Sequence, residues 1–261
     1  MSVEAVKTRQ VGGILEVVLD RPKANAIDLV TSRKLGEVFA SFRDDPALRV
    51  AVLTGGGEKF FCAGWDLKAA AGGDAVDGDY GVGGFGGLQE LRDLNKPVIA
   101  AVNGIACGGG LELALSADII LAADHASFAL PEIRSGTVAD AASVKLPKRI
   151  PYHVAMEMLL TGRWLDVEEA QRWGFVNYSV PQATLMDEAW ALARRLEAGP
   201  PLVYAAIKEI VREAEDAKFQ DVMNKITKRQ LQTVDVLYDS EDQLEGARAF
   251  AEGREPVWKG R

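Results

Sequence analysis

Two glutamates in this sequence have mostly apolar neighbours. Glu112 belongs to a short predicted helix whose neighbours at 111 and 113–115 are Leu, Leu, Ala and Leu. Glu132 ends an apolar run that begins at Phe128. Because an unpaired buried charge is very costly, each carboxyl group is expected to be paired, neutral or functional. A carboxyl group in such surroundings can transfer protons as a general acid or base.

Two glycine-containing turns supply backbone donors that could act together with these carboxylates. Ala63 and Gly64 precede a helix-like stretch, and the glycines 108–110 follow a predicted strand. Unpaired N–H groups at the start of a helix are positively polarised, which suits an oxygen that becomes negative during a reaction. One amide from each turn would form an oxyanion hole, so these groups fit acid–base chemistry on a carbonyl compound. Spacing alone leaves an alternative open, in which both glutamates belong to structural ion pairs.

The elements that would position these groups alternate along the first half of the chain. Four apolar runs are too short for helices and have turn residues nearby, so they are predicted as buried strands at 14–19, 50–53, 98–102 and 119–122. Between the first two, apolar residues at 35, 38, 39 and 42 recur at helical spacing. Alternating strands and helices predict an α/β fold with a largely parallel sheet.

The second half of the chain has a helical pattern. Helices are predicted at 153–161, 166–173, 184–197, 201–214, 217–237 and 241–251. Within the first half lies the glycine-rich segment 71–87, which is predicted as either a plain surface loop or a mobile lid over a site. It contains a GxGxxG match at 81–86, but no strand precedes it, so dinucleotide binding is not predicted.

Composition narrows the function classes. The net charge of −8 over 261 residues argues against a nucleic-acid-binding protein, because that affinity comes mainly from Lys and Arg. Two cysteines far apart form no disulfide framework, and two histidines exclude a zinc site of the HExxH type, so no metal is predicted. Neither a signal peptide nor a sufficiently apolar membrane span is recognised, so we expect a cytoplasmic protein without membrane association.

Several stretches together carry a resemblance to a known family. They are RPKANA at 21–26, FFCAGWDLK at 60–68, the long block at 98–132, and FAEGREPVWKGR at 250–261. They resemble the crotonase (enoyl-CoA hydratase/isomerase) family over nearly the whole chain. The resemblance implies a spiral of ββα units at 1–195 with the CoA and acyl site, followed by a helical C-terminal trimerisation region at 196–261. It also implies an acyl-CoA substrate, a homo-trimer or hexamer, and no cofactor beyond the coenzyme A of the substrate.

The resemblance also implies roles for the residues singled out above. The backbone N–H groups of Trp65 and Gly109 would hold the thioester oxygen, while Glu112 and Glu132 would flank the α,β double bond and share a water. Because both glutamates are present, reversible hydration and dehydration of a short acyl-CoA is favoured. Double-bond isomerisation stays an alternative. A non-catalytic scaffold or binding protein is a further one, because the family's proline and two glycines are missing from the loop at 137–143.

Further residues are expected to contact the substrate or its CoA. They are Lys23, Ala24, Ala26, Ala63, Gly64, Asp66, Leu67, Gly108, Pro131, Asp140 and Phe250, the last reaching the CoA of a neighbouring subunit. Asp140 stands where simple hydratases usually carry glycine. It is predicted either to be a counter-ion for a trimethylammonium head, helped by aromatic rings at 65, 80 or 85, or to cap the next helix.

Overall fold

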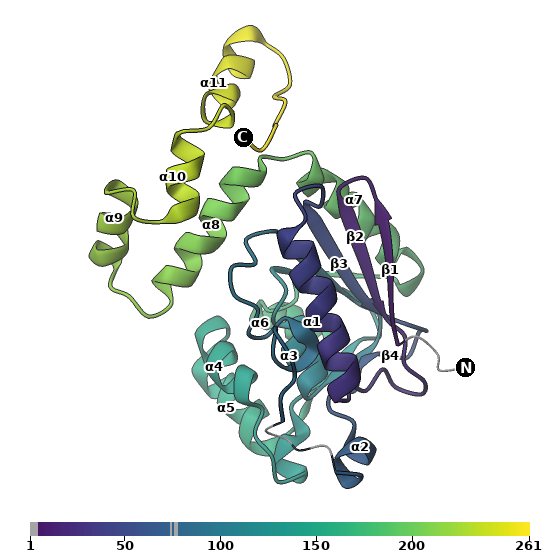
Figure 1. The fold of residues 1–261 in the computed structure, drawn as a ribbon. Coiled ribbons are helices and arrows are strands. Elements are labelled where there is room, and N and C mark those ends of the chain that lie inside the picture. The colour runs from purple at the N-terminus through teal and green to yellow at the C-terminus, as the bar shows by residue number, and fades with distance from the viewer. Residues whose placement is uncertain (1–4, 74, 76–77) are drawn as a thin grey trace.

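The computed structural model describes residues 5–73, 75 and 78–261, and its main feature is a six-stranded sheet (Figure 1). The strand order is β1-β2-β3-β5-β7-β10, and every neighbouring pair is parallel except β1 and β2. The strands are β1 (Val6–Val11), β2 (Ile14–Leu19), β3 (Val50–Gly55), β5 (Val98–Val102), β7 (Ile119–Ala123) and β10 (Tyr178–Val180). The four predicted strands and the largely parallel sheet are therefore confirmed.

A smaller sheet lies beside the main one and has the order β4-β6-β8-β9. Its strands have only three residues each: β4 (Phe60–Cys62), β6 (Ile105–Cys107), β8 (Ser127–Ala129) and β9 (Trp164–Asp166). Strands β4, β6 and β8 each follow a main-sheet strand and each precede a short helix. These short helices are α2 (Leu67–Ala71), α3 (Gly109–Ala114) and the 3-10 helix η2 (Pro131–Arg134). This threefold repeat of strand, strand and helix is the expected ββα spiral. Each short helix therefore begins at the corresponding point of its own unit.

Helices cover both faces of the main sheet. Helix α1 (Leu29–Asp44) packs on one face through Leu35, Phe39 and Phe42, which are fully buried. Helix α7 (Leu185–Glu197) packs on the other face against alternate residues of the same strands, such as Val50 and Val52. A sheet covered on both sides explains why every residue of β3 is buried.

The glycine-rich segment wraps around α1, as far as its described residues show. The Ser32 hydroxyl donates to the carbonyl oxygens of Tyr80 and Gly84 at 3.2 and 3.1 Å, respectively. Part of the segment forms the 3-10 helix η1 (Phe85–Gly87), in which Gly87 packs directly on the backbone of Gly36. The GxGxxG match therefore lies against a helix and does not follow a strand, as expected. Residues 74, 76 and 77 of the predicted loop lie outside the described residues.

Further helices follow the spiral and then form an arm. Before the arm in the chain come α4 (Asp140–Arg149), α5 (Tyr152–Thr161), α6 (Val167–Trp173) and the 3-10 helix η3 (Gln182–Thr184). The arm extends away from the sheets and contains α8 (Pro201–Ala214), α9 (Phe219–Thr227), α10 (Gln232–Tyr238) and α11 (Asp242–Glu252) (Figure 1). No helix in the described part of the chain is long and apolar enough to cross a membrane.

One predicted helix of the arm is wrong. The stretch predicted as a single helix at 217–237 consists of α9 and α10, and the chain turns between them. Arg229 in this turn has a φ of 55°, which a helix cannot accommodate. The turn lets Leu231 and Val234 pack with Ala206 of α8 in a small separate core. The domain boundary at 195 and the trimerisation role of 196–261 stay predictions.

Candidate active site

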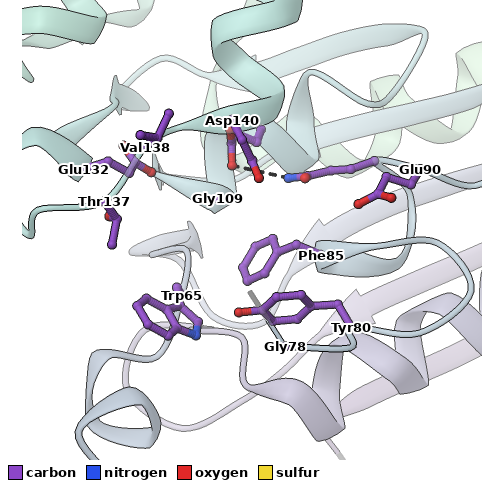
Figure 2. Close-up of a pocket in the computed structure, with 12 residues that line it drawn as sticks. Trp65, Gly78, Tyr80, Phe85, Glu90, Gly109, Glu132, Thr137, Val138 and Asp140 are labelled. Carbon is purple, nitrogen blue, oxygen red and sulfur yellow. Dashed lines mark hydrogen bonds between the residues drawn. The ribbon is translucent and has the colours of Figure 1, made fainter. Parts of the chain in front are cut away.

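A cavity of about 270 Å³ lies where the ββα units meet the glycine-rich segment (Figure 2). The side chains of Glu132 and Asp140 lie on one side of it, and the rings of Trp65, Tyr80 and Phe85 lie on the other. The lining residues are Trp65, Gly78, Tyr80, Phe85, Gln89, Glu90, Gly109, Glu112, Glu132, Thr137, Val138 and Asp140. The structure thus brings together the two glutamates and both glycine-containing turns that the sequence indicated.

Glu112 enters this cavity from the first turn of α3. Its side chain is almost fully buried, with the residue 5% exposed. Its Oε1 accepts a hydrogen bond from the backbone N–H of Ala142 at 2.8 Å, and its Oε2 accepts one from Gln89 Nε2 at 3.4 Å, drawn in Figure 2. It forms no ion pair with any described residue, so the structural ion-pair alternative does not hold for it.

Glu132 reaches the cavity from η2, beside Gly108. Its Oε2 is buried and has no hydrogen-bond partner among the described residues, and the side chain forms no ion pair there. A Cβ atom on Gly108 would lie 2.7 Å from Glu132 Oε1, so the missing side chain at 108 makes room for the carboxyl group. A buried carboxyl oxygen without a partner needs an explanation, and a ligand atom or water in the cavity would supply one.

Both glutamates hold their protons more tightly than usual. Burial, followed by the negative charges of Asp140 and Glu132, raises the pKa of Glu112 to about 7, although the Ala142 and Gln89 hydrogen bonds oppose this. Burial and the charge of Asp140 also raise the pKa of Glu132. Behind α3, burial lowers the pKa of Lys145 to about 8, and its ammonium group donates to Ser116 Oγ at 2.8 Å. The Glu112 carboxyl group can therefore exchange a proton near neutral pH.

The raised pKa of Glu112 has a measurable effect on stability. Below the ordinary carboxyl pKa of 4.5, Glu112 is neutral in both the folded and unfolded chain. As the pH rises from there to about 7, the unfolded chain releases this proton first, so folding loses stability. Glu112→Gln keeps the hydrogen-bond acceptor and removes the charge. We expect it to raise the free energy of unfolding by about 3 kcal/mol at pH 8 but only about 1 kcal/mol at pH 5.

Urea unfolding at both pH values measures this effect. The control is Glu37→Gln, which changes an exposed glutamate on α1 and should alter the free energy of unfolding by less than about 0.5 kcal/mol at either pH. A gain in Glu112→Gln that is equal at pH 5 and pH 8 would contradict the expectation, because it would reflect packing instead of a buried charge.

The two turns that could supply an oxyanion hole touch one another. Gly64 has a φ of +84°, and a Cβ atom there would lie 2.7 Å from Cys107 O and 2.9 Å from Gly109 N. Ile27 N–H donates to Gly64 O at 2.8 Å and Asp66 N–H donates to Ile27 O at 2.9 Å. This parallel bridge directs the N–H of Trp65, the residue between, away from Ile27.

The N–H groups of Trp65 and Gly109 have no acceptor among the described residues. Gly109 is the first residue of α3, and the first N–H groups of a helix have no acceptor within that helix. Two free amides on adjoining turns, at the wall of a cavity that contains two carboxyl groups, can polarise a carbonyl oxygen there.

The segment at 21–28 is held against the Trp65 turn by side chains whose roles were not predicted from the sequence. The Arg21 guanidinium donates to Ala26 O at 2.9 Å and pairs with Asp66 at 2.6 Å and Asp28 at 2.7 Å. Buried Asn25 accepts from Arg21 N–H and donates to backbone carbonyls at 56 and 60. The only sequence signal was the polar turn composition of RPKANA.

Seven of the eleven residues expected to contact the substrate or its CoA lie in the segments 23–26 and 63–67. Residues 24–26 lie beside 63–67, since Ala63 N–H donates to Ala24 O at 3.0 Å, and Lys23 and Leu67 are exposed next to them. Asp66 is occupied by the protein itself, because it pairs with Arg21 and caps α2. Pro131 begins η2. Phe250 on α11 is 89% exposed and does not line the cavity of its own chain.

Asp140 does not cap α4 in the expected way. The cap position is Ala139, and Asp140 is the first helical residue, where its Oδ1 accepts from Ala141 N–H at 2.7 Å. The N-cap alternative is therefore wrong. The position of Asp140 at the cavity wall agrees with the alternative that it is a counter-ion for a trimethylammonium head. Thr137 and Val138 line the cavity from the loop at 137–143. Gln89 and Glu90 also line it, and nothing in their sequence surroundings indicated this.

Comparisons with known proteins agree with this geometry. The model of the enoyl-CoA hydratase/isomerase family matches residues 9–261. The chain belongs to this family. It is 58% identical over 251 residues to a carnitinyl-CoA dehydratase of Citrobacter koseri, covering 96% of both chains.

Solved structures of the enoyl-CoA hydratase/isomerase family resemble the fold. An enoyl-CoA hydratase from Mycobacterium tuberculosis is 41% identical, with a TM-score of 0.88 over 98% of this chain and 99% of that one. A carnitinyl-CoA hydratase from Mycobacterium avium is 38% identical, with a TM-score of 0.77 over 100% of both chains. The fold expected from the sequence is thus confirmed as that of the enoyl-CoA hydratase/isomerase family.

Proposed function

We propose that the protein is a hydro-lyase that interconverts carnitinyl-CoA with crotonobetainyl-CoA and water. The observation that carries the proposal is that Glu112 and Glu132 face one cavity whose wall includes two free backbone amides. The similarity to carnitinyl-CoA dehydratases supports the choice of substrate. The coenzyme A is part of this substrate, and the reaction needs no further cofactor.

In the proposed reaction the thioester oxygen accepts hydrogen bonds from the N–H groups of Trp65 and Gly109. As water oxygen bonds to Cβ, the electron pair of the double bond moves toward the carbonyl group and forms an enolate-like state. The two amides stabilise the negative oxygen. Each such donor typically lowers the activation free energy by about 3 kcal/mol. Backbone amides suit this role because they are fixed by the fold before the substrate arrives.

The two glutamates carry the protons in this scheme. One carboxylate takes a proton from the water, and the other carboxyl group gives a proton to Cα. Dehydration is the reverse, with the hydroxyl group leaving as water. The pair starts with one proton between the two groups, which agrees with their raised pKa values and their mutual repulsion.

In this proposal the CoA portion would lie along the 23–26 and 63–67 segments, outside the cavity. Lys23 is exposed there and would contact a phosphate. A homo-trimer or hexamer fits the C-terminal arm, which exposes large apolar side chains such as Ile207, Val211, Phe219 and Phe250. In such an assembly Phe250 would reach the CoA of a neighbouring subunit.

The test compares crotonobetainyl-CoA with crotonyl-CoA by loss of the conjugated enoyl-thioester absorbance. We expect kcat/KM to be at least about tenfold higher for crotonobetainyl-CoA, because even one additional group that fits a substrate pocket typically contributes a factor of about this size. Faster turnover of crotonyl-CoA would indicate a generic short-chain enoyl-CoA hydratase. If neither thioester is hydrated, the protein is not a hydratase of this class.

A further inference from the structure

All the charged side chains that are described in the cavity wall are acidic. Four of its twelve lining residues carry carboxyl groups: Glu90, Glu112, Glu132 and Asp140. No Lys, Arg or His is among the described residues that line it. The aromatic rings of Trp65, Tyr80 and Phe85 lie across the cavity from the side chains of Glu132 and Asp140 (Figure 2). Carboxylates opposite aromatic rings are the surroundings that a quaternary ammonium ion prefers.

The chemistry of the proposed substrate places its positive charge close to the reacting atoms. In crotonobetainyl-CoA a single CH2 group joins the quaternary nitrogen to Cβ, so the two atoms are about 2.5 Å apart by ordinary bond geometry. The counter-ion must therefore stand beside the carboxyl groups that act on Cα and Cβ. Neither Glu112 nor Glu132 can be a permanent counter-ion, because each must change its charge during the reaction.

Asp140 fits this position better than Glu90. The charge of Asp140 acts on both Glu112 and Glu132, whereas Glu90 is not among the charges that act on either. Glu90 instead lies against the glycine-rich segment, where its N–H donates to Gly83 O at 2.9 Å and its carboxyl group packs on Gly84.

The Asp140 carboxylate is available to a ligand. Its Oδ1 accepts from the adjoining Ala141 N–H, and it forms no ion pair with a described residue. On the opposite side, the Tyr80 and Phe85 rings pack edge to face with centroids 5.3 Å apart. Both residues belong to the glycine-rich segment, and their rings together form one wall of the cavity.

We propose that Asp140 is the specificity-determining counter-ion for a quaternary ammonium group on the acyl chain, with Tyr80 and Phe85 contacting that group from the other side. This inference rests on the proposed function and names the group that recognises its substrate. Without a cation in the cavity, the Asp140 charge repels the ionised glutamates. A bound cation offsets this repulsion, so Asp140 selects for charge and not for shape.

A neutral substrate of the same shape separates charge from shape. In 5,5-dimethylhex-2-enoyl-CoA a tert-butyl group replaces the trimethylammonium group. The quantity measured is the ratio of kcat/KM for crotonobetainyl-CoA to kcat/KM for this neutral thioester. Asp140→Asn is expected to lower the ratio about 10- to 100-fold, since opposite charges in contact at a protein surface change binding by about this factor. Asp140→Glu keeps the charge and is expected to keep most of the ratio.

Asp140→Asn should fold normally, because Asp140 is exposed and Asn retains the acceptor for Ala141 N–H. Its melting temperature is measured alongside, and Asp140→Ser is a second neutral variant. Glu90→Gln is the matched comparison, because it removes the other non-catalytic charge of the cavity wall. We expect it to change the ratio less than about threefold, as for a charge screened by solvent.

The outcomes separate this inference from the proposed function. If the natural protein hydrates crotonobetainyl-CoA but Asp140→Asn leaves the ratio unchanged, the role of Asp140 is refuted and the function stands. If Glu90→Gln lowers the ratio instead, the counter-ion is Glu90. If the natural protein hydrates only the neutral thioester, both the proposed substrate and the counter-ion are refuted.

Discussion

Glu112→Gln and Glu132→Gln, made singly, are each expected to lower kcat for hydration by about 10²- to 10⁴-fold. Glutamine has nearly the shape of glutamate but neither gives nor takes a proton. Because both side chains face the same cavity and neither has an ion-pair partner among the described residues, their charge serves no packing purpose that the variants would lose. Steady-state kinetics with crotonobetainyl-CoA measures kcat, and calorimetry with carnitinyl-CoA measures binding, which should change far less.

The control for these variants is Glu37→Gln on the exposed side of α1, which should retain the natural kcat. A second assay follows double-bond migration in a 3-enoyl-CoA. Isomerisation can proceed with one carboxyl group, so a protein that keeps migration in one variant and never shows hydration would be an isomerase. Loss of hydration in only one of the two variants would contradict the shared role of the pair.

The dependence of kcat/KM on pH indicates which glutamate takes which part. The pKa of Glu112 is raised to about 7, so the profile of the natural protein should bend near this pH. A rate that rises with pH through the bend means that Glu112 acts as the ionised base. A rate that falls means that it acts as the protonated acid. In either case the bend should disappear in Glu112→Gln and persist in Glu37→Gln.

Much of the fold could be predicted because its signals are local. The strands β2, β3, β5 and β7 are short apolar runs, and they are apolar because helices cover both faces of their sheet. The site glutamates were recognisable for a related reason, since a carboxyl group amid Leu and Ala residues contradicts the surrounding pattern. Such a departure from local consistency often marks a functional position.

The features that could not be predicted depend on contacts between segments that are far apart in the sequence. The approach of Gly64 to Gly109 joins two turns 45 positions apart, and no periodicity indicates it. Gln89 contacts Glu112 only because the glycine-rich segment wraps around α1. The break between α9 and α10 contains neither Gly nor Pro, so composition gave no signal for it. Strands of three residues, such as β9, are too short to show an alternating pattern.

An ester in place of the Trp65 amide is expected to lower kcat by about 10²- to 10³-fold. Incorporation of indole-3-lactic acid at position 65 replaces the N–H with oxygen and leaves the side chain unchanged. The Trp65 N–H points away from Ile27 and has no acceptor among the described residues, so its removal breaks no bond within the folded protein. The loss should therefore appear in the barrier to reaction, and kinetics with crotonobetainyl-CoA measures it.

An ester at Ile27 is the matched control for this experiment. An ester at 65 also weakens Gly64 O as the acceptor of the Ile27 N–H, which donates to it at 2.8 Å. The ester at 27 removes that same hydrogen bond but keeps the Trp65 N–H. We expect it to cost about 1 kcal/mol of stability and to lower kcat less than about fivefold, because a single neutral backbone bond contributes about this much. If the two esters lower kcat equally, the Trp65 amide does not stabilise the thioester oxygen. A large loss at 65 alone would show that the Trp65 N–H stabilises the negative charge that develops on the thioester oxygen.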